Sequence, residues 1–104
     1  MNIQKMLQQA QRMQSDMAQA QKNLAKQTVE AGAGGGRVTV TATGAQEITS
    51  IKIAKEVVDP NDVEMLQDLV LNAVQQALAK SKELAAGEMG KLTQGMGLPP
   101  GMGL

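Results

Sequence analysis

The first helix predicted from the sequence carries an apolar seam with heptad spacing. Its members are separated by alternating steps of three and four residues: Ile3, Met6, Ala10, Met13, Met17, Ala20 and Leu24. A period of 3.5 residues keeps a narrow stripe on one side of a helix, whereas a helix lying on a globular core usually carries a broader one. The spacing predicts a helix over residues 1–27 that packs along another helix. The expected dimerisation contacts in this seam are Ile3, Met6, Met13, Met17 and Leu24.

This helix is long and only weakly apolar. Its seam is dominated by Met and Ala, and Gln is frequent at the flanking positions. At about 1.5 Å per residue, a helix of this length spans roughly 40 Å, which exceeds what a compact domain of this size covers. We therefore expect the helix to project from the body of the protein as an arm.

The composition excludes most kinds of chemistry. The 104 residues include no Phe, Tyr, Trp, Cys or His. A short chain without aromatic side chains builds a small core, so we expect a homodimer. The absence of Cys and His removes thiol nucleophiles and the commonest general base and metal ligand. We expect no enzyme activity, cofactor, metal site or small-molecule substrate.

No segment of the sequence resembles a membrane anchor or a signal peptide. No apolar run approaches the 18 or so residues that a spanning helix requires, and the N-terminus lacks the regions of a secretory signal. A cytoplasmic protein without a membrane partner is expected.

Alternating residues after the first helix predict a small sheet over residues 28–58. A short strand over 28–31 precedes the glycine run 32–36, which cannot sustain a helix. Residues 37–43 alternate strictly between apolar and polar types, and 48–53 form the returning strand of a hairpin. The glycine run precedes a strand and lacks the spacing of a phosphate-binding fingerprint, so we interpret it as a loop.

One residue of the returning strand is out of phase with its neighbours. Ile51 and Ile53 share a face, whereas Ile48 falls on the other face in a regular strand. Either a bulge near the turn restores its phase, or Ile48 covers the far side of the sheet.

A second helix is predicted over residues 59–88. Asp59 is suited to cap the free amides and Pro60 suits the first helical position. The apolar stripe that follows is wider than a seam, so we expect it to cover the sheet and to turn its remainder toward the first helix or a second copy. Leu66 and Val70 are the expected dimerisation contacts there. Residues 89–104 predict a flexible tail rich in Gly, Met and Pro.

These elements predict one α+β domain over residues 1–88, ordered helix, three strands, helix. The carboxylates near the start of the second helix, among them Asp62, Glu64 and Asp68, fit a capped and solvated helix end better than an active site.

Basic side chains recur on one face of the first helix. Lys5, Arg12 and Lys26 fall at multiples of seven residues, with Gln19 completing the line. Successive members lie about 10.5 Å apart, which suits contacts with the phosphates of a duplex without base-specific geometry. A solvated polar face has the same pattern, and ten basic and ten acidic residues leave the chain neutral. Both DNA binding and a solvated polar face without a binding function fit these residues.

The sequence resembles the YbaB/EbfC family of bacterial nucleoid-associated proteins over nearly its whole length. The resemblance rests on the run from Asp62 to Ala73, on the glycine run, and on Val38-Thr39-Val40 and Ile51-Lys52-Ile53. It implies an intertwined homodimer with two protruding helical arms that binds duplex DNA, alters its conformation and is associated with the nucleoid in the cytoplasm.

The DNA contacts implied by the resemblance are the cations of the arm and of the second helix: Lys5, Arg12, Lys22, Lys26, Lys80 and Lys82. Gene regulation, nucleoid organisation and DNA protection are the expected roles. The alternative is a coiled-coil clamp or chaperone-like adaptor that binds client proteins through Met6, Met13 and Met17.

Overall fold

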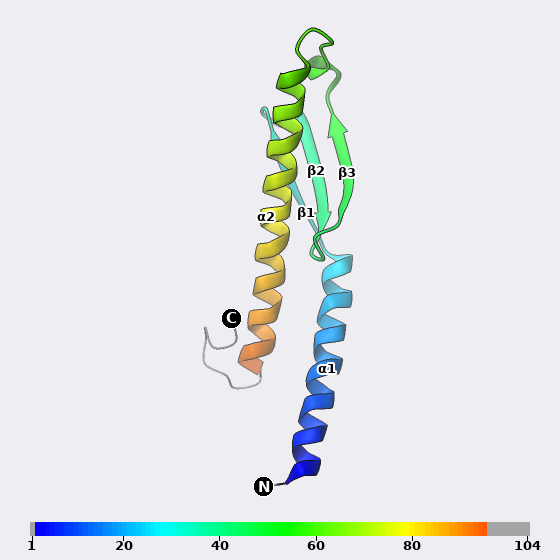
Figure 1. Cartoon of the computed structure of the whole chain (residues 1–104), viewed down its shortest axis with the longest axis vertical. Coiled ribbons are helices and arrows are strands. Elements are labelled where there is room, and N and C mark those ends of the chain that lie inside the picture. The colour runs from blue at the N-terminus through cyan, green and yellow to red at the C-terminus, as the bar shows by residue number, and fades with distance from the viewer. Residues whose placement is uncertain (1, 96–104) are drawn as a thin grey trace.

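The protein is an elongated α+β molecule, seen in a computed structural model that describes residues 2–95. Its extents are 70 × 22 × 16 Å. The elements follow in the order α1 (Ile3–Lys26), β1 (Thr28–Ala33), β2 (Val38–Thr43), β3 (Ile48–Ile53), the 3-10 helix η1 (Lys55–Val57) and α2 (Val63–Gly95). The strands form one antiparallel sheet in the order β1-β2-β3, and the predicted helix–sheet–helix fold is confirmed (Figure 1).

The core lies between α2 and the first two strands. Val38 and Val40 of β2 are fully buried, as the alternation predicts for one face of that strand. Opposite them, Ala73 and Ala77 of α2 are also fully buried. Because these alanines are small, α2 can approach the sheet closely, and the core needs no aromatic side chain.

A bulge in β3 accounts for the phase of Ile48. Thr41 pairs with Ser50, but the next residue of β2, Ala42, pairs with Ile48, so Thr49 is an extra residue in the ladder. The extra residue returns Ile48 to the apolar face, where it packs against the core. The bulge interpretation is confirmed.

The glycine run forms the turn between β1 and β2. Gly34, Gly35 and Gly36 all adopt positive φ angles, at 64°, 70° and 87°. Side chains with a Cβ rarely occupy this region, which explains why three glycines follow one another here. The predicted loop between two strands is confirmed, although β1 continues to Ala33 rather than ending at residue 31.

The predicted start of α2 at residue 59 is wrong, because the helix begins at Val63. Asp62 is the capping residue, and its Oδ1 accepts a hydrogen bond from the amide of Met65 at 3.2 Å. The Asp59 side chain instead accepts from the amide of Asn61 at 2.9 Å. Asp59 therefore stabilises a turn before the helix, a local alternative that aspartate offers as readily as a cap.

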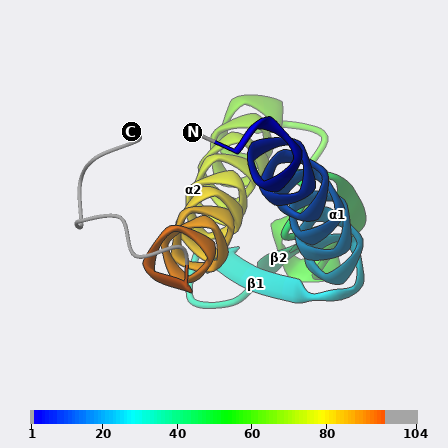
Figure 2. The ribbon, with the colours of Figure 1, turned by 90° about the horizontal axis from the view of Figure 1, so that it is seen from below.

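The predicted end of α2 at residue 88 is also wrong, since the helix continues to Gly95. Gly87 and Gly90 lie within it, each at a cost of about 1 kcal/mol relative to alanine. The C-terminal turns of α2 run beside α1 (Figures 1 and 2), and the helix continues through both glycines. The remainder of the predicted tail, residues 96–104, lies outside the described residues.

Helix α1 leaves the sheet as the predicted arm. Among its residues, only Ala20 and Leu24 are buried. Its N-terminal turns extend beyond the end of the α2 ribbon (Figure 1). Most of the side-chain surface of α1 is consequently open to solvent or to a partner.

Candidate nucleic-acid interface

The four cations of α1 lie on exposed positions of the arm. Asn2 caps this helix through its Oδ1, which accepts from the amide of Gln4 at 3.1 Å. Within residues 2–95, none of the four has an ion pair or side-chain hydrogen bond, so their charges are available to a ligand; they are Lys5, Arg12, Lys22 and Lys26.

The arm is predominantly basic. Asp16 is the single carboxylate of α1 against those four cations. Because Arg12 lies seven residues after Lys5, their Cα atoms are about 10.5 Å apart along the axis on the same side of the helix. Exposed ammonium and guanidinium groups at this spacing can each meet a phosphate.

Gln19 is turned toward the second helix. It lines a groove of about 290 Å³ between α1 and α2, together with Asp16, Asn23 and residues of α2 that include Glu88 and Lys91. Its Nε2 donates to Asn23 Oδ1 at 3.1 Å. At this position of the predicted line, the Gln19 side chain is thus bonded to its own helix.

The two candidate cations of α2 have different environments. The ammonium group of Lys80 donates to the main-chain carbonyl of Glu30 in β1, at 2.8 Å. Lys82 is exposed and has no such bond among the described residues. Lys80 thus has a structural partner in the sheet, whereas Lys82 resembles the cations of the arm.

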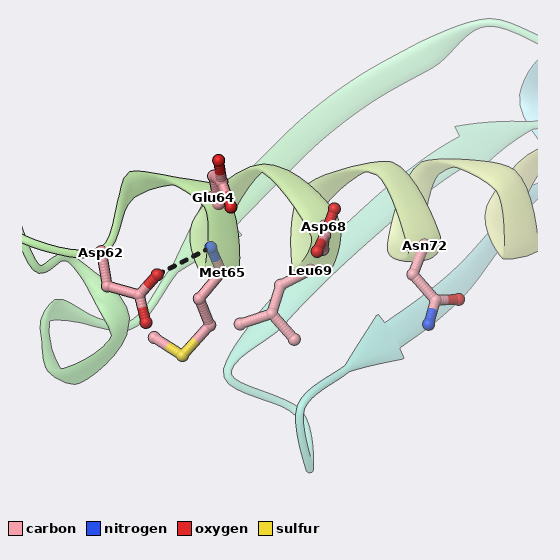
Figure 3. A pocket seen from close by; sticks show the side chains of 6 residues that line it. All are labelled: Asp62, Glu64, Met65, Asp68, Leu69 and Asn72. Carbon is pink, nitrogen blue, oxygen red and sulfur yellow. Dashed lines mark hydrogen bonds between the residues drawn. The ribbon is translucent and has the colours of Figure 1, made fainter.

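The opposite end of the molecule is acidic. A surface hollow of about 400 Å³ at the start of α2 is lined by residues that include Asp62, Glu64 and Asp68 (Figure 3). In the described part of the chain, no group of three or more His, Cys, Asp or Glu is arranged to hold a metal ion. These carboxylates repel phosphate, so the charge distribution favours a polyanion at the arm and disfavours it at this end.

The predicted dimerisation residues lie in three environments. Ile3, Met6, Met13 and Met17 are exposed on α1, whereas Leu24 is only 4 % exposed and packs within its own chain. Leu66 and Val70 line an apolar groove of about 470 Å³ beside β3. The surface available to a second copy therefore comprises the outer part of the seam and this groove.

Two residues connect the turn between β2 and β3 to the helices, a role that the sequence pattern did not assign to them. Gly44, in the turn between β2 and β3, donates its amide hydrogen to Leu24 O at 2.9 Å. Ser81, fully buried on α2, donates to Thr43 O at 2.6 Å. A serine inside a helix gives no sequence signal of such a role, because its partner lies 38 positions away.

None of the described helices is long and apolar enough to cross a membrane.

Comparison with known proteins gives one consistent result. Residues 1–96 match the model of the YbaB/EbfC DNA-binding family. A nucleoid-associated protein of Ruminiclostridium cellulolyticum is 54 % identical over 101 residues, covering 97 % of this chain and 88 % of that protein. A nucleoid-associated protein of Akkermansia muciniphila is 50 % identical over 103 residues, covering 99 % of both chains.

The fold also occurs in a solved structure. An uncharacterized protein of Helicobacter pylori, HP0035, superposes with a TM-score of 0.75, covering 92 % of this chain and 97 % of that chain. At 19 % sequence identity, this likeness concerns the fold alone.

Proposed function

The chain belongs to the YbaB/EbfC DNA-binding family, and from this membership we propose that it is a nucleoid-associated protein that grips duplex DNA with the arm α1. The observation that supports this assignment is the set of four exposed cations on α1, which have no acidic partner among the described residues. Contacts of this kind are made to phosphates and do not read base sequence. The proposed activity is a change of DNA conformation, from which roles in nucleoid organisation, gene regulation and DNA protection follow.

The test compares the two arginines of the chain. Arg12 lies on the arm, and Arg37 lies on the body with its Nε 3.7 Å from a carboxylate oxygen of Glu56. In fluorescence anisotropy titrations with a mixed-sequence duplex, Arg12→Ala is expected to weaken binding about tenfold, which corresponds to about 1.4 kcal/mol. Arg37→Ala is the matched control and is expected to bind as the wild type does. An equal change in affinity for both substitutions would contradict an interface on the arm.

We propose that the protein acts as a homodimer. The apolar groove beside β3 supports this proposal, because no charged side chain lines it; its residues are Ile53, Leu66, Gln67, Val70, Leu71 and Val74. Isologous association brings the same patch of both copies together, so a patch without charge avoids repulsion between like groups. Each copy would then contribute one cationic arm to the same duplex.

The strand beside the groove also favours a second copy. Ile51 and Ile53 lie on the face of the sheet that α2 covers over β1 and β2, yet they are 46 % and 41 % exposed. Apolar side chains on an edge strand invite pairing with another chain. A second copy that covers β3 and the groove would bury them.

A client-binding adaptor is the second candidate function. The observation that favours it is the exposure of Met6, Met13 and Met17 on the arm, since methionine side chains adapt to varied apolar partners. Association with clients through these residues would resist salt and be lost on Met13→Lys, whereas binding to DNA phosphates weakens steeply with salt.

A further inference from the structure

The arm is held to its own chain by very little packing. Of the residues of α1, only Ala20 and Leu24 are buried, and both lie in its last two turns. A long helix that is packed only at one end has a defined direction only if directional contacts, such as hydrogen bonds, hold that end. The turn between β2 and β3 supplies them.

Backbone hydrogen bonds tie the end of α1 to this turn. The amide of Gly44 lies 2.9 Å from Leu24 O and 3.0 Å from the carbonyl oxygen of the cap residue Gln27. Leu24 O also accepts from the amide of Gln27 at 3.2 Å, so the bond from Gly44 adds to the helix's own capping contact. The turn therefore fixes the position of the end of α1 relative to the sheet.

The same turn is held from its other side by α2. The buried hydroxyl of Ser81 donates to Thr43 O at 2.6 Å and accepts from the amide of Gln46 at 3.1 Å. Gln46 has a φ of 63° and is the non-glycine residue with positive φ within residues 2–95. That conformation is unfavourable for a residue with a Cβ, and the bonds that the Gln46 amide donates to Ser81 Oγ and, at 3.0 Å, to Thr43 O stabilise the shape of the turn.

There is no room for a side chain where the turn meets the arm. A Cβ added to Gly44 would lie 2.8 Å from both Leu24 O and Leu24 Cδ2, and 3.1 Å from Leu84 Cδ2. The first of these atoms belongs to the backbone of α1, so it can give way only if the helix moves. Glycine at position 44 thus permits the close approach of arm, turn and α2.

We propose that Gly44 and Ser81 are positioning residues for the arm. Together with Leu24, Thr43 and Gln46 they form a unit, here called the arm clasp, that sets the direction in which α1 presents its cations. Gly44 sets the mean direction through close packing, and Ser81 limits the spread of directions through its two hydrogen bonds. The clasp itself follows from these contacts, and its effect on DNA binding rests on the proposed function.

Pulsed electron spin resonance can measure the direction of the arm without DNA. The chain contains no Cys, so spin labels can be attached specifically at Gln11→Cys on the arm and Lys52→Cys on β3, both of which are exposed. Labelled protein is diluted into an excess of unlabelled protein, so that only distances within one chain are recorded. The width and the mean of the distance distribution then report the freedom and the direction of α1.

Two substitutions should change this distribution in different ways. Ser81→Ala is expected to broaden it, because the turn loses both bonds to α2. Gly44→Ala is expected to shift its mean, because the added methyl group displaces Leu24. The matched control is Ala77→Gly, which lies one helical turn before Ser81, is equally buried and destabilises α2 without touching the clasp. Where Gly44→Ala does not fold, Ser81→Ala decides the question alone.

Equal distributions for Ser81→Ala and Ala77→Gly would overturn the proposal, since general destabilisation would then explain any change. In duplex titrations, Ser81→Ala is expected to weaken binding roughly three- to tenfold relative to Ala77→Gly, because a loosened arm must be ordered on binding. A broader distance distribution in Ser81→Ala with unchanged affinity for duplex would overturn the role of the clasp in DNA recognition. A broader distribution in Ser81→Ala, together with a wild type that binds no duplex, would instead refute the proposed function but support the positioning role of the clasp.

Discussion

The Nζ atom of Lys80 on α2 lies 2.8 Å from the carbonyl oxygen of Glu30 on β1 and donates a hydrogen bond to it. The outer edge of β1 is therefore partly closed by the chain itself. The other edge of the sheet, β3, makes no comparable contact with α2 among the described residues. This asymmetry leaves β3 as the edge that a second copy can cover.

Lys80→Met should lower the free energy of unfolding by about 1 kcal/mol, because the carbonyl of Glu30 loses its donor. Urea titration followed by circular dichroism measures this quantity. Lys82→Met is the matched control on the same helix and should change stability by less than about 0.5 kcal/mol. A larger loss of DNA affinity in Lys82→Met than in Lys80→Met would agree with the different environments of the two lysines.

Leu71→Lys should convert the proposed dimer to a monomer. Leu71 lines the apolar groove and is 56 % exposed, so a charge there would be buried without a partner in the dimer. Sedimentation velocity distinguishes the two states. Met65→Lys, an exposed apolar residue of α2 outside the groove, is the control and should remain dimeric. A dimeric Leu71→Lys would exclude this groove from the interface.

Ala73→Leu should destabilise the fold by about 1–3 kcal/mol, because added carbon atoms cannot be accommodated between α2 and the sheet. Thermal unfolding provides the measurement. Ala79→Leu introduces the same change at an exposed position of α2 and should leave the transition nearly unchanged. Similar transitions in both variants would mean that α2 does not approach the sheet as closely as its buried alanines indicate.

Asp62→Ala should cost about 0.5–2 kcal/mol of stability through the loss of the helix cap. Asp68→Ala removes a carboxylate from the same exposed end of α2 without a capping bond, which controls for the change in charge. Equal effects on the urea midpoint would show that charge, and not the bond to Met65, explains the loss.

The sheet and the first helix could be predicted because their patterns are local. The alternation around Val38 and Val40 fixes which face of β2 is buried, and the glycines after Ala33 can form only a turn. There is a physical reason why the predicted bounds of α2 are wrong. Asp59 and Asp62 are both good caps, and a glycine within a helix lowers its stability without necessarily ending it.

The candidate site was predictable only in part. Spacing along one helix identifies Lys5 and Arg12, because residues seven apart share a side. It also places Gln19 on this line, although Gln19 lines the groove shared with α2. It says nothing about Lys80, whose bond partner lies 50 positions away. The arm clasp has no local pattern, because Gly44 reaches Leu24, and Ser81 reaches Thr43 and Gln46, only in the folded chain.

The most direct test of DNA binding through the arm is a salt series. The logarithm of the association constant for a mixed-sequence duplex is measured against the logarithm of salt concentration for the wild type, Arg12→Ala and Arg37→Ala. Each lost phosphate contact reduces the steepness of this line by roughly 0.9. The expected result is a reduction of at least this size for Arg12→Ala and none for Arg37→Ala. A line for Arg12→Ala parallel to that of the wild type would contradict it.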